Sequence, residues 1–211
     1  MLIPLDVLAR THHLDIGGVL HLGCHLAEEA KAYHQSNVGK VWWVEALPDV
    51  AERARQRLAR YPDQEVIEAC VADRGGETVT FHRANNGMSS SLLDFGTHTE
   101  QSPDVHYTED LTLTTTTVDE ITFEYHVEAD FLNMDLQGAE LLALRGAVAF
   151  LRGVDFIYTE VNWEPLYVGC VLLPQLDAWL ADQGFTRYDT QMAGNSGWGD
   201  AFYARPKALG L

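Results

Sequence analysis

Apolar residues occur in short runs that alternate with amphipathic stretches along the chain. The runs at residues 19–22, 40–44, 65–71, 131–134 and 155–161 are typical of buried strands. The stretches after them carry apolar residues at helical spacing, as in residues 48–60, 140–151 and 172–183. Strands that alternate with helices predict an α/β fold with a mostly parallel sheet.

The C-terminal part of the chain completes this sheet. Residues 185–188 and 201–204 are predicted as two further strands, and the absence of a helical pattern between them favours an antiparallel pair at the sheet edge. We therefore expect a Rossmann-like, seven-stranded sheet that is mostly parallel, with an antiparallel last strand and helices on both faces. The 211 residues are expected to form one domain, with a leading helix within residues 1–16.

Two more segments, residues 77–82 and 111–118, alternate with a period of two. They predict a hairpin-like extension, residues 77–118. The intervening residues 83–110 hold three consecutive serines and the sequence Gly96-Thr97-His98. A long loop inside a compact domain is usually functional, so we expect a lid, with an exposed polar loop as the alternative.

The first strand leads into a turn that can hold a nucleotide-like cofactor. Gly23 opens this turn, and a helix is expected to begin near Leu26 with Glu28 and Glu29 in its first turn. Only the first small position of a GxGxG-type loop is glycine, because His25 and Ala27 occupy the other two. This pattern disfavours a pyrophosphate and favours a cofactor without phosphates.

Acidic residues follow four predicted strands at the carboxyl edge of the sheet. Glu45 follows the second strand, where a carboxylate can accept hydrogen bonds from both ribose hydroxyls of a cofactor. Its alternative role is a negative charge at the N-terminus of the next helix. Asp73 follows the third and could accept from an adenine amine or form an Asx turn. Asp135 and Glu160 end neighbouring strands, which makes them candidates for chemistry, with helix capping as the alternative for Asp135.

The charge balance limits the classes of partner. The chain has 31 acidic and 14 basic residues and a formal net charge of -17, which disfavours a nucleic acid or an acidic membrane as partner. The three cysteines are isolated, as expected in a reducing compartment, and no apolar run reaches the length of a membrane span. We expect a cytoplasmic protein with a small-molecule partner; the sequence does not indicate its oligomeric state.

Several motifs occur in order along the chain and together resemble one known family. They are His21-Leu22-Gly23-Cys24-His25, Trp43-Val44-Glu45-Ala46, residues 85–92 (NNGMSSSL), residues 133–140 (NMDLQGAE), residues 158–162 (YTEVN) and residues 197–201 (GWGDA). In these motifs the chain resembles the FkbM family of S-adenosylmethionine-dependent methyltransferases. The resemblance implies a class I methyltransferase fold and transfer of a methyl group from S-adenosylmethionine to a hydroxyl of a sugar, glycoside or natural product.

On this basis we assign expected roles to individual residues. The expected cofactor-binding residues are His21, Gly23, Cys24, His25, Glu45, Ala46, Asp73 and Asp135. The expected catalytic residues include Asp135, as the base or as the group that orients the acceptor, and Glu160, which is expected to bind other acceptor hydroxyls together with Asn162. His25 is a second base candidate, with a structural hydrogen bond as its alternative. The expected acceptor-binding residues are Ser89, Ser90, His98, Asn162, Trp163 and Trp198; for the tryptophans, core packing is the alternative to stacking on a sugar.

Three other interpretations remain open at this point. An N-methyltransferase would need less help from a base, and a non-catalytic adenosylmethionine-binding or interaction module would explain the altered glycine loop. Asp135, Glu160 and Asn162 could also hold a divalent metal such as magnesium, although no further carboxylate is obvious nearby. We favour the metal-free O-methyltransferase.

Overall fold

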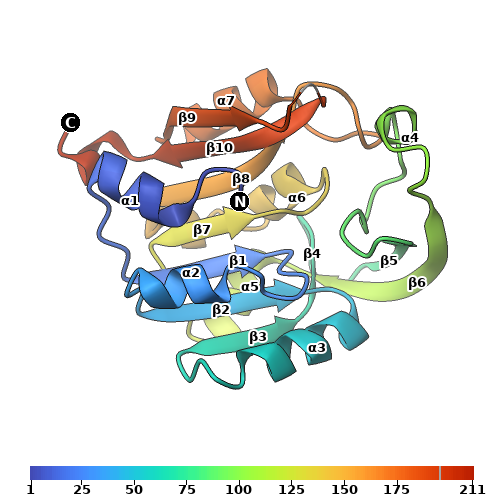
Figure 1. Cartoon of the computed structure of the whole chain (residues 1–211), viewed down its shortest axis with the longest axis horizontal. Helices are drawn as coiled ribbons and strands as arrows, with labels where there is room; N and C mark the ends of the chain where they lie inside the picture. Colours follow the sequence, from blue (N-terminus) through green and yellow to red (C-terminus); the bar gives the residue numbers. More distant parts are fainter. Residues whose placement is uncertain (195) are drawn as a thin grey trace.

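A seven-stranded sheet forms the centre of the computed structural model, which describes residues 1–194 and 196–211 (Figure 1). The strand order is β3-β2-β1-β7-β8-β10-β9, and β10 alone runs antiparallel to its neighbours. The strands are β1 (Gly18–Leu22), β2 (Lys40–Glu45), β3 (Gln64–Glu68), β7 (Phe131–Met134), β8 (Phe156–Asn162), β9 (Thr186–Met192) and β10 (Trp198–Ala204). The predicted mostly parallel sheet with an antiparallel last strand is confirmed.

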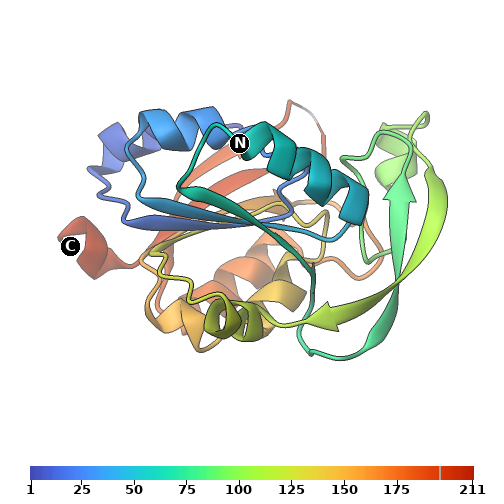
Figure 2. The ribbon, with the colours of Figure 1, turned by 90° about the horizontal axis from the view of Figure 1, so that it is seen from below.

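Helices cover both faces of this sheet, as Figure 2 shows from the side. One face carries α1 (Leu5–His12), α2 (Ala30–Gln35) and α3 (Pro48–Leu58). The other carries α5 (Val118–Glu124), α6 (Glu140–Arg145), α7 (Leu173–Asp182) and the 3-10 turn η1 (Phe150–Arg152). The 3-10 turn η2 (Pro206–Leu209) packs against the core beneath α1–α3.

The strands are apolar on both sides because each side packs against helices. In β1, Val19 belongs to the core beneath α1–α3, whereas Leu20 belongs to the core beneath α5–α7. Phe131 and Leu132 divide in the same way in β7. Each fully buried side chain of this size contributes about 1.5–3 kcal/mol relative to exposure. The two cores therefore explain why the strand runs are nearly continuous rather than alternating.

A second, three-stranded sheet extends beyond the carboxyl ends of the central strands (Figure 1). It consists of β4 (Cys70–Val71), β6 (Tyr107–Thr116) and β5 (Thr78–Ala84), and β5 pairs antiparallel with β6. Between β5 and β6 lies the 85–106 loop, which includes α4 (His98–Gln101). The loop is shorter than the predicted 83–110 because both strands extend further into it.

The helix expected near Leu26 begins only at Ala30. His25 and Ala27 both adopt positive φ, at 45° and 53°, and this left-handed backbone is incompatible with a helix. The residues that replace the usual glycines therefore form a series of turns. Glu28 and Glu29 lie in these turns and not in a first helical turn.

Three other predicted boundaries were wrong. The predicted third strand, 65–71, breaks at Ala69, because β3 pairs with β2 whereas β4 pairs with β6 in the second sheet. The predicted strand 111–118 ends at Thr116, and α5 follows with a capping box between Thr117 and Glu120. The predicted helix over 140–151 stops at Arg145, with Gly146 as its C-cap, and η1 follows separately.

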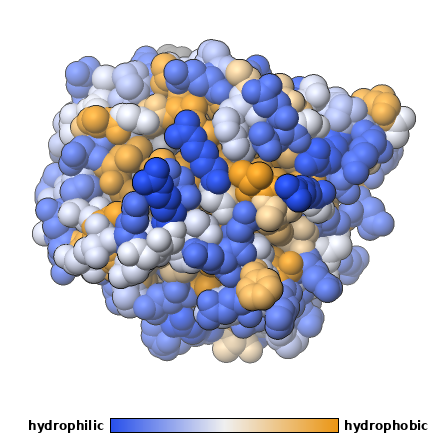
Figure 3. Space-filling view, turned by 180° about the vertical axis from the view of Figure 1, so that it is seen from behind, coloured by the Kyte–Doolittle hydropathy of each residue, from blue (hydrophilic) through white to orange (hydrophobic). Residues whose placement is uncertain are grey.

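The surface is mainly polar, in line with the high net charge. On the face opposite to the view of Figure 1, hydrophilic residues predominate and hydrophobic ones form small separate patches (Figure 3). Within the described residues, no helix combines the length and the apolar character needed to cross a membrane.

Candidate active site

Polar side chains gather on one face of the sheet, near its carboxyl edge. In the strand register His21 of β1 lies beside Asn133 of β7, and Glu160 of β8 lies beside Asp200 of β10. Side chains two residues apart on a strand share a face, so Asn162 falls on the same face as Glu160. This face is the one covered by α1–α3. The alternation of side chains along the strands therefore places these polar groups on one face, near the carboxyl edge of the sheet.

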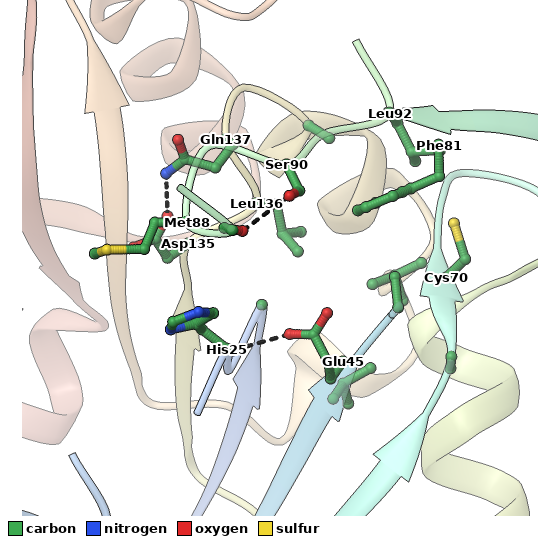
Figure 4. Close-up of a pocket in the computed structure, with 17 residues that line it drawn as sticks. His25, Glu45, Cys70, Phe81, Met88, Ser90, Leu92, Asp135, Leu136 and Gln137 are labelled. Carbon is green, nitrogen blue, oxygen red and sulfur yellow. Dashed lines mark hydrogen bonds between the residues drawn. The ribbon is translucent and has the colours of Figure 1, made fainter. Parts of the chain in front are cut away.

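The first cavity lies between the ends of β1 and β2, the second sheet and the 85–106 loop (Figure 4). Four of the residues predicted to bind a cofactor line it with Glu45, namely Gly23, His25, Ala46 and Asp135. Its remaining wall is largely apolar and includes Ala69, Val71, Phe81, Met88, Leu92 and Leu136. An acidic group at one end and an apolar wall at the other suit a molecule with hydroxyls and a flat ring.

Glu45 is held in a fixed orientation at the end of β2. Its Oε1 accepts from the backbone N–H of Leu47 at 2.9 Å, and its Oε2 accepts from the backbone N–H of His25 at 2.9 Å. Burial raises the pKa of this carboxyl, and the two N–H donors offset part of that effect. Each oxygen keeps a second lone pair, so Glu45 can accept from two further hydroxyl groups.

Gly23 allows the ends of β1 and β7 to approach closely. Its φ is +77°, and a Cβ atom placed there would lie 1.9 Å from the backbone oxygen of Asp135. The N–H of Asp135 in turn donates to the carbonyl of Leu22 at 3.0 Å. Glycine is required here both for its backbone conformation and for this contact.

We expect Gly23→Ala to lower the free energy of unfolding by about 3 kcal/mol or more, because it combines a left-handed backbone with a clash against backbone. Gly76→Ala is the matched control, since Gly76 has φ +79° but no atom within 4 Å of the added Cβ. That control should cost about 1 kcal/mol. Urea unfolding of both variants measures the difference, and equal losses would show that the contact with Asp135 is unimportant.

The second cavity shares a border with the first. Gly23, His25, Met88 and Asp135 line both cavities. The second cavity is otherwise lined by His21, Cys24, Glu28, Glu29, Trp198 and Asp200, and by Met1 and Leu2. The N–H of Leu2 donates to Asp200 Oδ2 at 2.6 Å, which holds the N-terminal residues against the cavity. Two molecules bound in the two cavities would therefore lie next to each other at Asp135.

Asp135 and Glu160 form a carboxylate pair joined by Gln137. Gln137 Nε2 donates to Asp135 Oδ1 at 2.6 Å and to Glu160 Oε2 at 2.9 Å. The Asp135 side chain is exposed to solvent, yet desolvation by the surrounding protein atoms raises its pKa to about 6. Glu160 is only 6% exposed, and burial and the charge of Asp135 raise its pKa well above the usual range. The two carboxyl groups therefore disfavour each other's ionised form, and Glu160, which is the more deeply buried, is the harder of the two to ionise.

Helix capping is not the role of Asp135 in this structure. The N-cap of α6 is Ala139, without a side-chain hydrogen bond. Glu140 Oε1 instead accepts from the N–H groups of Leu136 at 2.9 Å and Gly138 at 3.2 Å. Glu140 therefore stabilises the turn after β7 and leaves Asp135 facing the cavities.

The two histidines of the first motif differ in their surroundings. His21 is buried, stacks on Trp43 and approaches the Tyr33 hydroxyl at 3.1 Å; burial lowers its pKa to about 4, so it stays neutral. His25 contacts Glu28 through Nδ1 at 3.1 Å, and this hydrogen bond raises its pKa. A raised pKa leaves less of His25 in the neutral form that can accept a proton, so the arrangement favours Asp135 over His25.

Several predicted residues lie away from the first cavity. Asp73 follows β4 in the second sheet and is not among the described residues that line either cavity, because the chain has already left the central sheet at Ala69. Cys24 is buried and lines only the second cavity. Trp163 packs against the core beneath α5–α7, which is the core-packing alternative to stacking on a sugar. Trp198 lines the second cavity.

The polar residues predicted to bind the acceptor from the 85–106 loop lie in different surroundings. Ser90 lines the first cavity and donates to the carbonyl of Gly87 at 2.8 Å. Ser89 is buried in a hydrogen bond with Asn86 inside the loop. His98 stacks on Phe95 with ring centroids 4.4 Å apart. Only Ser90 of the three lines either cavity among the described residues.

Sequence reasoning missed four residues that the structure brings to the site: Phe81, Met88, Gln137 and Asp200. Gln137 and Asp200 lie inside motifs that were recognised, but no role was assigned to them. Phe81 and Met88 come from β5 and the 85–106 loop, whose position depends on how the second sheet folds over the first. Met88 is 66% exposed, which is unusual for a large apolar side chain beside a cavity.

Within the described part of the chain, no three His, Cys, Asp or Glu side chains are grouped so that they could hold a metal ion.

Comparison with known proteins gives consistent results. The model of the methyltransferase FkbM domain matches residues 21–187. The 2-O-methyltransferase NoeI of Sinorhizobium fredii is 26% identical over 160 residues, which cover 72% of this chain. The match spans 65% of that relative's length.

Solved structures share the fold at low sequence identity. A SAM dependent methyltransferase from Aquifex aeolicus has a TM-score of 0.54 at 13% identity, over 96% of this chain and 89% of its own. The magnesium protoporphyrin IX methyltransferase of Synechocystis, solved with bound SAH, has a TM-score of 0.55 at 10% identity, over 95% and 78%. At these identities the likeness shows the fold, and the predicted class I methyltransferase architecture is confirmed.

Proposed function

The chain belongs to the FkbM methyltransferase family, and on that premise we propose that it binds S-adenosylmethionine and transfers the methyl group to a hydroxyl oxygen of a small acceptor, a sugar, glycoside or natural product. The observation that carries the proposal is the shared border of the two cavities at Gly23, His25, Met88 and Asp135. One cavity suits the cofactor, the other suits the acceptor, and a candidate base lies where they meet.

The first cavity fits this cofactor on its own chemistry. Glu45 has free lone pairs for the two ribose hydroxyls, and the apolar wall formed by Val71, Phe81 and Leu92 suits an adenine ring. No Lys or Arg is among the described residues that line this cavity, as expected for a ligand without phosphates.

The acceptor needs a positioned base. When bound, S-adenosylmethionine supplies an electrophilic methyl group on a sulfonium. A hydroxyl is a weak nucleophile while protonated, and Asp135 lies where it can take that proton. Gln137 stabilises the charge on Asp135 with a hydrogen bond and links it to Glu160. Most of the remaining acceleration comes from holding the acceptor in line, which is the task of the second cavity.

The second cavity favours an acceptor without negative charge. Glu28, Glu29, Asp135 and Asp200 line it, and no Lys or Arg does among the described residues. Asn162, predicted to bind the acceptor, is 1% exposed and is not among the described residues that line this cavity, although neither of its amide atoms has a partner within the described structure. The name of the Sinorhizobium relative, a 2-O-methyltransferase, also supports an oxygen acceptor.

A panel of acceptors tests this assignment. With radiolabelled S-adenosylmethionine, we expect label on neutral glycosides or polyol natural products at a rate at least tenfold above that on nucleotide-linked sugars or a short RNA, because anions are repelled by the acidic cavity. Each product is identified by mass and by stability to base, which separates ethers from esters. Preferred labelling of the anionic acceptors would contradict the proposal.

A further inference from the structure

The side-chain amide of Gln137 has a defined orientation. Its Oε1 accepts from the hydroxyl of Tyr167 at 2.5 Å, and its Nε2 donates to both Asp135 and Glu160. An amide nitrogen has two hydrogens, and each is used by one carboxyl group. The opposite orientation would place the amide oxygen against an ionised carboxylate. The Tyr167 hydroxyl therefore selects the orientation in which the pair receives donors.

Tyr167 is well suited to fix this amide. It is 1% exposed, and burial raises the pKa of its hydroxyl, which favours the protonated form that donates. Its side chain packs against the turn at Gly138, where an added Cβ would lie 2.9 Å from the Tyr167 Cβ. The ring also packs on Phe95 and His98 of the 85–106 loop. Tyr167 is thus held from two sides.

The backbone of Gln137 is also constrained. Its φ is +52°, a left-handed conformation that few residues other than glycine adopt. Its carbonyl accepts from Ser91 Oγ of the 85–106 loop at 2.8 Å. The loop and the carboxylate pair are therefore connected through one residue. A glutamine in a left-handed conformation, whose side-chain amide bonds to two carboxyl groups, indicates a functional constraint.

We propose that Gln137 and Tyr167 are positioning residues for the Asp135–Glu160 pair: Tyr167 fixes the Gln137 amide, and the amide nitrogen, which lies closer to Asp135 than to Glu160, stabilises the ionised form of Asp135. The contacts do not depend on the proposed function. Only their purpose, which is to keep Asp135 ready to accept a proton, rests on it. The other titratable groups that act on Asp135 are Glu29, Glu140, Asp200 and the amino group of Met1.

Removal of the Tyr167 hydroxyl should make the amide free to turn. Asp135 would then lose a donor to its charged form, and a hydrogen bond to a charged group is worth enough to shift its ionisation about tenfold. The pH at which Asp135 is half-protonated should therefore rise by about 1 in Tyr167→Phe. Gln137→Met, which keeps the length of the side chain but removes both donors, should give a rise at least as large.

Carboxyl NMR tests this directly. The full chain labelled with 13C at Asp and Glu carboxyl groups is titrated between pH 4 and 8, with Asp135→Asn and Glu160→Gln to assign the two signals; the lower apparent pKa of the coupled pair is followed. Tyr107→Phe is the matched control, because Tyr107 stacks on the same Phe95 but donates to Leu93 instead. The control should leave both titrations unchanged.

An Asp135 titration that is the same in wild type, Tyr167→Phe and Gln137→Met would overturn the inference. S-adenosylhomocysteine affinity is measured in the same samples and should stay within twofold of wild type in Tyr167→Phe, because Tyr167 is not among the described residues that line either cavity. Absence of binding to the wild type would contradict the proposed function instead, while the titration, which needs no cofactor, would still decide the role of Gln137 and Tyr167.

Discussion

Asp135→Asn is expected to lower kcat by about 10²–10⁴-fold, the usual contribution of a positioned general base. The amide can still fill the space and contact Gln137, but it cannot take a proton from an acceptor hydroxyl. The affinity for S-adenosylmethionine should change less than twofold, because Glu45 and the apolar wall of the first cavity hold the cofactor. Stability should be nearly unaffected, since Asp135 does not cap α6.

Steady-state kinetics with the best acceptor of the panel measure this effect. The same base role predicts the pH dependence: with a pKa of about 6, Asp135 is ionised above that pH and protonated below it, so kcat/KM should be high above pH 6 and fall about tenfold per pH unit below it. Asp182→Asn, an exposed aspartate on α7, is the control. Turnover of Asp135→Asn within threefold of wild type would remove Asp135 from the mechanism.

Glu45→Ala is expected to weaken binding of S-adenosylmethionine by a factor of ten or more. The substitution removes both acceptors for the ribose hydroxyls, and it also releases the N–H groups of His25 and Leu47 that the carboxylate holds. Two hydrogen bonds to a charged group account for a loss of this size. The effect should appear as a higher Kd.

Equilibrium dialysis with labelled cofactor measures that loss, and urea unfolding shows whether the turn at His25 has also been weakened. Glu68→Ala is the matched control, because Glu68 lies beside Glu45 in the strand register but outside the described lining of the first cavity. The control should bind like the wild type. A Kd for Glu45→Ala within twofold of wild type would exclude the ribose contact.

The fold could be predicted from the sequence where one run of residues determines one element. Residues 131–134 form β7 as predicted, because an apolar run closed by Asp135 leaves few alternatives. The start of α2 could not be predicted, since it depends on the left-handed conformation of His25 and Ala27, which their side chains do not reveal. The break at Ala69 depends on a pairing between β4 and β6 that is distant in the sequence.

The same distinction applies to the site. Gly23, Glu45 and Asp135 could be predicted because parallel strands bring their carboxyl ends to one edge. Tyr167 could not, since it lies on an irregular segment after β8 and reaches Gln137 only through the packing of the 85–106 loop. Asp73 was expected at the same edge as Glu45, but the chain leaves the central sheet before reaching it.

If the first cavity binds S-adenosylmethionine, isothermal titration of the wild-type protein with S-adenosylmethionine and S-adenosylhomocysteine should detect it. We expect saturable binding of both ligands with one site per chain, together with a rise in the thermal unfolding temperature. Absence of heat and of a thermal shift with either ligand would contradict it, and would mean that His25 and Ala27 in the altered glycine loop prevent the cofactor from binding.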